Sequence, residues 1–179
     1  MEKLLAAAMM IIAIGTYSLS RAETATMTAQ DEKAWVRHLI PLPHEISIGK
    51  KTVLKARDIS ITGTQSPGDI ERNAVATVET LFREKTGALP KGKAFTILLG
   101  VADKNGKVNG VTVRNYERLK TLPNNDQAYV FEPNGDNSLL LAALDGKGLY
   151  YAAETLVQLL EPFMTKETVA VPLAEIVDW

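Results

Sequence analysis

The stretch "QAYVFEPNGDNSLLLAALDGKGLYYAAETLVQLL", residues 127–160, decides the fold. Its first part, Gln127 to Glu132, alternates between side chains of different polarity, which is typical of a strand. Asn134-Gly135 separates it from the apolar run Ser138 to Leu144, and Asn-Gly between two such runs predicts a tight β-hairpin. The segment "DGKG", Asp145 to Gly148, then leads into a helix.

That helix is predicted from spacing, because its apolar residues recur on one face until Pro162 closes it. The recurring residues are Leu149, Ala152, Ala153, Leu156, Leu159 and Leu160. A second helix is predicted upstream, with Ser66 as N-cap, Pro67 at the first helical position and Gly87 as a left-handed stop. Asp69 follows three residues after this cap, and the face predicted to be buried consists of Ile70, Ala74, Val78, Leu81 and Phe82.

Several further segments are predicted to be strands. Ala94 to Val101 is a continuous apolar run and is expected to be a central strand. Val169 to Val177 is expected to be the last strand, where Pro172 favours an edge position or a bulge. The others are 45–48 and 52–55 around a turn at Gly49-Lys50, and 58–62. Residues 108–123 give no clear pattern, although "VRNYERLK" is compatible with a short helix.

This order of elements predicts an α+β fold, a mixed α/β sandwich. We expect one mostly antiparallel or mixed sheet with two long helices packed on one face. The chain has 179 residues, enough for one domain of ordinary size. It contains no Cys, so a hydrophobic core must hold the fold together. Its formal net charge is −1 with both signs interleaved, which argues against a nucleic-acid partner.

The N-terminus has the features of an export signal. "MEKLL" precedes an apolar run from Leu4 to Leu19, and Ser20 and Ala22 are small residues at the positions that signal peptidase inspects. We therefore predict a signal peptide over 1–22, a polar linker over 23–36 and the domain over 37–179. The expected location is exported, periplasmic or extracellular, with no stable membrane span after cleavage. A retained membrane anchor is the alternative, because Glu2 offsets Lys3.

Metal binding is not expected. "HEISI" at His44 begins like the zinc motif H-E-x-x-H, but the fifth position is Ile48, and Pro43 favours an extended backbone. The other histidine, His38, lies six residues upstream, a spacing that cannot replace the missing ligand. No cofactor is expected either. "DGKG" lacks the complete phosphate-binding patterns, so Asp145 is interpreted as a helix cap beside glycines that permit a tight turn.

No catalytic residue is predicted. The adjacent acids Asp31 and Glu32 fall in the expected linker, and there is neither a Cys nor a G-x-S-x-G motif. Asp126, Asp136 and Asp145 occur at strand ends or turns, where Asp is common for backbone reasons. Tyr129, Tyr150 and Tyr151 could stack on sugars, but burial in the core is the favoured role, although at most one of the adjacent Tyr150 and Tyr151 can face the core fully and the other is expected near the surface.

The order of these segments resembles the N-terminal α/β domain of β-N-acetylhexosaminidases of glycoside hydrolase family 20. The resemblance covers Leu39 to Trp179, from "LIPLPHEISI" through "FTILLGVAD" and residues 127–160 to "VAVPLAEIVDW". It implies a zincin-like topology that binds no zinc. It also implies that catalysis belongs to a following (β/α)₈ barrel, so no catalytic or sugar-contacting residue is assigned to this chain.

Two hypotheses follow. The resemblance implies a non-catalytic accessory domain whose partner is a catalytic barrel, in the parent protein or as a separate chain. The alternative is a stand-alone exported module that binds glycan or another protein. Under either hypothesis Trp179 either packs back onto its own domain or marks a docking surface.

Overall fold

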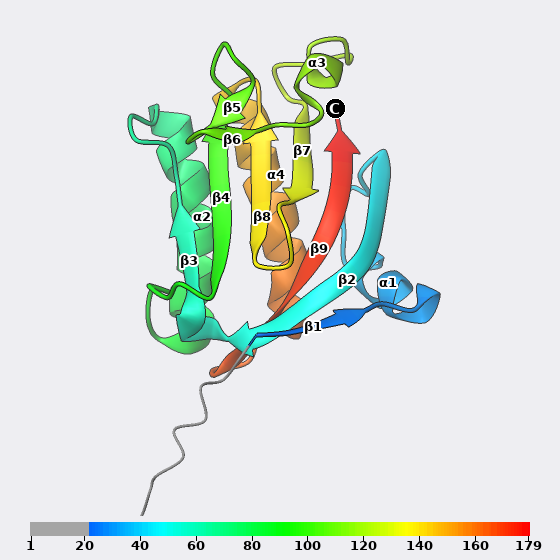
Figure 1. Cartoon of the computed structure of the whole chain (residues 1–179), viewed down its shortest axis with the longest axis vertical. Coiled ribbons are helices and arrows are strands. Elements are labelled where there is room, and N and C mark those ends of the chain that lie inside the picture. Colours follow the sequence, from blue (N-terminus) through cyan, green and yellow to red (C-terminus); the bar gives the residue numbers. More distant parts are fainter. Residues whose placement is uncertain (1–21) are drawn as a thin grey trace, which may run out of the picture.

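The computed structural model describes residues 22–179 and shows a single large sheet with helices against it (Figure 1). The sheet has seven strands in the order β1-β2-β9-β7-β8-β4-β3. No helix of residues 22–179 is long and apolar enough to cross a membrane. The strands of the sheet are β1 (Glu23–Thr26), β2 (Glu45–Lys55), β3 (Ile59–Thr62), β4 (Phe95–Val101), β7 (Tyr129–Pro133), β8 (Ser138–Ala143) and β9 (Thr168–Asp178). The α-helices are α1 (Ala29–Val36), α2 (Asp69–Thr86), α3 (Tyr116–Leu119) and α4 (Gly146–Leu160).

The sheet is mixed, as predicted, and β8 is the strand at which its direction changes. β8 pairs antiparallel with β7 and parallel with β4, and β4 pairs parallel with β3. The predicted hairpin joins β7 to β8, and Gly135 in its turn has a φ of 72°. The apolar run of β4 is covered on both faces, because Ile97 and Leu99 belong to the main core and Leu98 to a second apolar cluster on the opposite face.

The two long helices α2 and α4 lie side by side on one face of the sheet, behind the strands in Figure 1, which confirms the predicted fold class. Their inner faces and the strands form the main core, which includes Phe82, Phe131 and Leu141. Asp145 is the N-cap of α4, as predicted from "DGKG". Its side chain accepts a hydrogen bond from the Lys147 N–H at 3.0 Å. A Cβ on Gly148 would lie 2.4 Å from the Ala128 carbonyl oxygen. This glycine is therefore required by close approach rather than by a special backbone angle.

The opposite face of the sheet is covered in part by the segment between β4 and β7, which sequence patterns left open. It contains the short strands β5 (Lys107–Val108) and β6 (Val111–Thr112) as well as α3, and it buries a second apolar cluster. Glu132 on β7 anchors this segment. Its carboxylate accepts hydrogen bonds from the backbone N–H of Arg114 and from the backbone and side-chain N–H of Asn115, each at 2.8 Å.

Residues 23–36 were expected to be a polar linker, but in the structure they form elements of the domain. β1 pairs antiparallel with β2, and Thr28 and Asp31 form a capping box at the start of α1. Trp35 is 2% exposed and stacks on Phe163 with ring centroids 3.7 Å apart. The segment has a polar composition because an edge strand and a helix with one buried residue expose most of their side chains.

The predicted turn at Gly49-Lys50 is also wrong, since β2 is one continuous strand with a register shift between Ile48 and Lys50. This register shift is a β-bulge, so Gly49 marks an irregularity within one strand rather than a turn between two strands. Pro172 lies in β9, inside the sheet order, but β7 pairs with β9 only from Ile176 onward. The missing N–H of Pro172 is tolerated because the ladder at this position has a partner on the β2 side only.

The start of α2 differs from its prediction as well. The N-cap is Gly68 rather than Ser66, and the Glu71 carboxylate accepts a hydrogen bond from the Gly68 N–H at 2.6 Å. The same carboxylate accepts a hydrogen bond from the Val101 N–H at 3.2 Å, so contact with β4 fixes this end of the helix. Gly87 ends α2 with a φ of 78°, as predicted.

The approach of α4 to the β7 strand can be tested with Gly148→Ala. The added methyl group would meet the Ala128 carbonyl oxygen and, at 3.0 Å, the Ala143 Cβ. We expect a loss of about 1–3 kcal/mol in the free energy of unfolding, measured by urea denaturation. Gly49→Ala is the matched control because nothing lies within 4 Å of its Cβ position. An equal loss in both variants would contradict the packing argument.

The role of Glu132 can be tested with Glu132→Gln. An amide would turn a donor group toward N–H groups that now meet only acceptor oxygens, and we expect a loss of about 2–4 kcal/mol in the free energy of unfolding. Glu175→Gln is the control, because Glu175 binds the same Arg114 guanidinium at 3.0 Å but is exposed. Its expected cost is below about 1 kcal/mol. Similar melting temperatures for the two variants would refute the anchoring role.

Candidate docking face

The two histidines lie in different surroundings. The His44 Nδ1 is 2.6 Å from the Asp178 Oδ1, and its ring stacks on Trp179 with centroids 4.0 Å apart. His38 instead has its ring edge toward Phe163. Within residues 22–179 no group of three or more His, Cys, Asp or Glu side chains is arranged to hold a metal ion. The stacking against His44 shows that Trp179 packs back onto its own domain, which is the first of the two alternatives stated for it.

The acidic residues considered for catalysis are not brought together. The Asp31 carboxylate accepts a hydrogen bond from the N–H of the N-cap Thr28 at 3.1 Å, and the Glu32 carboxylate accepts one from the Ile48 N–H at 2.9 Å. Asp126 pairs with Lys147 and Asp136 with Lys50, each at 3.0 Å, while Asp145 caps α4. Each of these carboxylates thus has a structural partner, which explains its place in the sequence without any catalytic role.

The outer side of the two long helices carries exposed apolar residues. Tyr150 and Tyr151 on α4 are 37% and 46% exposed, and Ile70 on α2 is 44% exposed. Ile40 is 80% exposed and is held beside α4, since its N–H donates to the Gln158 Oε1 at 2.7 Å. We call the surface formed by Ile40, Ile70, Tyr150 and Tyr151 the helix face.

Two sequence interpretations are corrected here. Burial, the favoured role of the tyrosines, holds for Tyr129, which is 3% exposed, but not for Tyr150 or Tyr151. Ile70 was expected to lie on the buried side of its helix and does not. Its position beside Gly146, at the first turn of α2, places it beyond the main core. Ile40 was not singled out from the sequence, because its position depends on a contact with α4 that is distant along the chain.

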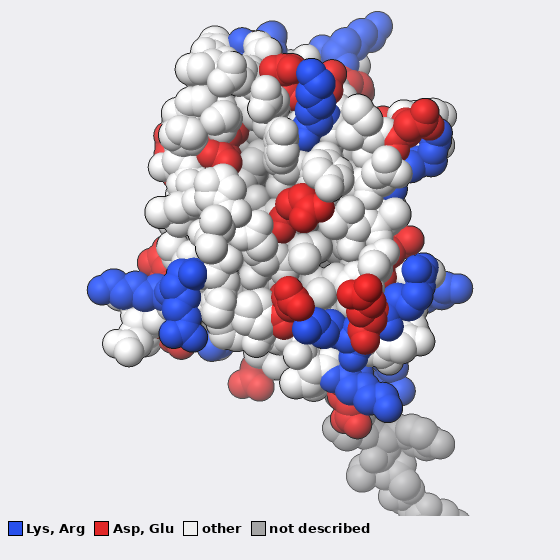
Figure 2. Space-filling view, turned by 180° about the vertical axis from the view of Figure 1, so that it is seen from behind, with Lys and Arg blue, Asp and Glu red and all other residues white. Residues whose placement is uncertain are grey.

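The charges beside the helix face are neutralised by partners. Lys147 pairs with Asp126, and Lys85 at the end of α2 pairs with Glu161 at 2.9 Å. Figure 2, which views this side, shows uncharged atoms over much of the surface, with acidic side chains near the centre and most basic side chains toward the edges. Charges that already have partners are less costly to cover than free charges.

Titration properties agree with this pairing. The hydrogen bond to Glu154 raises the pKa of the Tyr150 hydroxyl, and the negative charge of Glu154 adds to the effect. The hydrogen bond to Asp126 likewise raises the pKa of Lys147. Tyr150 and Lys147 thus keep their neutral and cationic forms, respectively, at neutral pH. The helix face has two exposed aromatic rings, paired charges and no concentration of reactive groups, a composition suited to docking rather than to chemistry.

Comparisons with known proteins agree with the fold. The chain matches the family model described as glycosyl hydrolase family 20, domain 2, over residues 36–179. A comparison with curated proteins finds no match. Among solved structures, the Streptomyces plicatus N-acetyl-β-hexosaminidase is 20% identical, with a TM-score of 0.51, over 79% of this chain and 26% of that chain. An inactive mutant of the Vibrio harveyi exo-β-N-acetylglucosaminidase is 16% identical, with a TM-score of 0.51, over 89% of this chain and 21% of that chain.

The structural likeness shows the fold, and the chain spans only about a quarter of the length of these two relatives. The family match is more informative because it covers most of the chain. It identifies the accessory domain 2 and not the catalytic barrel, so the chain by itself is non-catalytic. The chain belongs to glycosyl hydrolase family 20, as domain 2 of that family.

Proposed function

We propose that this chain acts as an accessory domain that packs through its helix face against a catalytic barrel of the family 20 type. The observation that carries the proposal is the exposed apolar surface of Ile40, Ile70, Tyr150 and Tyr151 on a chain that matches domain 2. A domain of this kind would buttress the barrel rather than contact the reacting sugar. Its biological context would be the hydrolysis of N-acetylhexosaminides, the activity named for the two structural relatives.

The helix face fits such a partner in composition. Exposed aromatic rings are the residues that most often dominate the energy of an interface, and Tyr150 and Tyr151 stand adjacent on one helix. A (β/α)₈ barrel presents an outer ring of helices, so helix-on-helix packing would bury both tyrosines. The ion pairs at Lys147 and Lys85 would then form part of the polar rim of the interface.

Export is a further part of the proposal. It rests on the amino-acid sequence of residues 1–22, because the predicted signal peptide lies outside the described residues except for Ala22. We propose a periplasmic or extracellular location for the domain, which is compatible with a chain that has no Cys to be oxidised.

The docking proposal can be tested by titrating the chain with a folded family 20 barrel purified without its own domain 2. We expect measurable association by calorimetry, and no turnover of an aryl N-acetylglucosaminide by the chain alone. Tyr150→Ala/Tyr151→Ala should weaken association by about 30-fold or more, since aromatic anchors contribute about 1–2 kcal/mol each or more.

Val53→Ala is the matched control, because Val53 is an exposed apolar residue on β2, away from the helices. It should bind the barrel like the unmodified chain. Docking through the helix face would be refuted if the tyrosine variant bound with unchanged affinity, or if the barrel bound neither form. Turnover by the highly purified chain would refute the non-catalytic assignment.

A further inference from the structure

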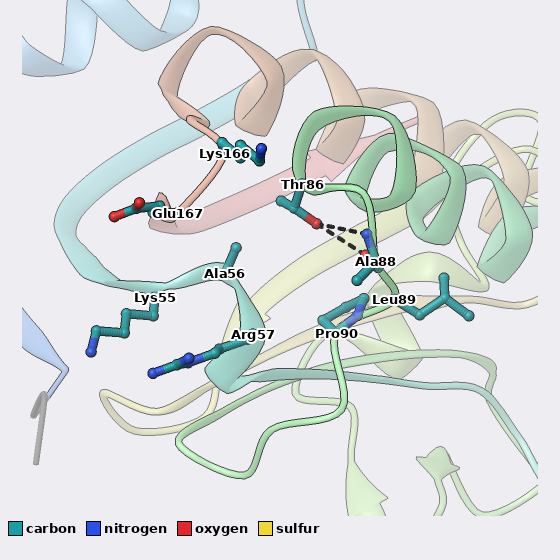
Figure 3. A pocket seen from close by; sticks show the side chains of 9 residues that line it. All are labelled: Lys55, Ala56, Arg57, Thr86, Ala88, Leu89, Pro90, Lys166 and Glu167. Atoms are coloured by element: carbon teal, nitrogen blue, oxygen red, sulfur yellow. Dashed lines mark hydrogen bonds between the residues drawn. The ribbon is translucent and has the colours of Figure 1, made fainter.

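A hollow of about 410 Å³ lies at the end of the molecule where β2 passes into β3. Its walls are the β2–β3 junction, the loop after α2 and the loop before β9, which bring together segments far apart in the sequence (Figure 3). Three cations line this hollow. Lys55 and Arg57 belong to the β2–β3 junction, and Lys166 belongs to the loop before β9. The loop after α2 adds Thr86 and an apolar floor of Ala88, Leu89 and Pro90.

Two further lysines adjoin this end. The turn containing Lys91 and Lys93 is bonded to the β2–β3 junction, since the Gly92 N–H donates to the Ile59 carbonyl at 2.7 Å and the Ala94 N–H to the Asp58 carbonyl at 2.9 Å. We call the surface formed by these cations the basic pole. Its members are Lys55, Arg57, Lys91, Lys93 and Lys166.

The basic pole gathers lysines that, in the described part of the chain, lack a carboxylate partner. Within residues 22–179 its four lysines have no ion pair, and Arg57 lies 3.9 Å from Asp58. The neighbouring acids are Asp58, Glu167 and Glu23, so cations are in excess on a chain whose formal net charge is −1. By contrast, Lys147 beside the helix face has a carboxylate partner, Asp126. An excess of unpaired cations at one end indicates an anionic partner.

The chain enters the domain at this same pole. Glu23, the first residue of β1, is the register partner of Val53, two residues before Lys55. In the sequence, the apolar run Leu4 to Leu19 ends four residues before Glu23. The four Cα–Cα steps from Leu19 to Glu23 can span at most about 14 Å. Wherever that apolar run meets a bilayer, it therefore keeps the end of the domain that carries the basic pole close to the headgroups.

We propose that the basic pole rests on a membrane surface of anionic phospholipid. Each Lys or Arg near such a surface contributes about 1 kcal/mol, and the attraction falls off within a Debye length. The arrangement favours a surface over a small anion inside the hollow. Figure 3 shows the Lys55 and Arg57 side chains extending alongside one another and away from Thr86, rather than converging on a single point. The Thr86 hydroxyl already donates to the Phe82 carbonyl at 2.7 Å.

This orientation leaves the helix face free, so the inference does not depend on the proposed barrel partner. It applies both to a retained anchor and to the period before a signal peptide is removed. In both cases the apolar run and the pole approach the same bilayer.

The test uses the full chain mixed with vesicles of phosphatidylcholine, with or without phosphatidylglycerol. An amine-reactive reagent that cannot cross the bilayer labels exposed lysines, and mass spectrometry gives the labelling rate of each. We expect Lys91 and Lys93 to be labelled about 5-fold or more slowly on the anionic vesicles, whereas Lys104 and Lys107 are unchanged. Raising the salt from about 0.1 M to about 1 M should remove the protection, because the Debye length falls from about 10 to about 3 Å.

Two charge-reversed variants sharpen the test. Lys55→Glu/Lys166→Glu should abolish the protection of Lys91 and Lys93. Lys104→Glu/Lys107→Glu, with the same change in net charge in the loop after β4 and at the start of β5, should leave it intact. Circular dichroism melting checks that both variants fold. Equal labelling on both kinds of vesicle, or equal loss in both variants, would overturn the proposal. Protection by a sulfated polysaccharide but not by anionic vesicles would overturn it in favour of an anionic glycan.

Discussion

The structure depends on covering both faces of β8. Leu139 and Leu141 face the two long helices, while Leu140 and Ala142 face the segment that contains α3. A strand that is apolar on both faces cannot lie at the surface of a sheet, so it requires a layer on each side. At its edges β8 is flanked by β4, which is parallel to it, and by β7, which is antiparallel and joined to it by the hairpin.

The two covering layers are secured in different ways. On the helix side, α4 can approach the strands closely because Gly148 has no side chain at the point of contact. On the other side, the layer is thin and is held by a buried carboxylate, Glu132, that accepts hydrogen bonds from the chain turn before α3. A small apolar cluster gains little from burial alone. A buried charge whose bonds are all satisfied supplies a fixed attachment in its place.

The surface carries two distinct regions, the helix face and the basic pole, and the fold itself requires neither of them. The helix face concentrates exposed apolar residues, and the basic pole concentrates cations at the end where the chain enters the domain. β1 and most of α1 precede the residues that match the family model, and they place this entry point by pairing with β2. The family match therefore accounts for the core and the helices, whereas the extension determines which end of the domain faces the preceding segment.

Local signals in the sequence determined the central elements. The Asn134-Gly135 turn, the Asp145 cap and the Gly87 stop act through their own backbone and nearest neighbours, and these were predicted correctly. The apolar pattern also predicted α4 and β4 correctly. In α4 the apolar residues recur on one face of the helix, and in β4 they form a continuous run that is buried on both faces. The structured part of residues 23–36 was missed because its stability comes from β2 and from the Trp35–Phe163 contact.

Other features were decided only by tertiary structure. The start of α2 is set by Glu71 reaching β4, and Glu132 selects the position of a segment with no pattern of its own. The exposure of Tyr150 and Tyr151 and the gathering of Lys55, Arg57 and Lys166 likewise depend on which distant segments pack together. Composition and periodicity show that a side chain can be buried or exposed, but only the packed chain decides which charges are paired and which apolar residues are left without a neighbour.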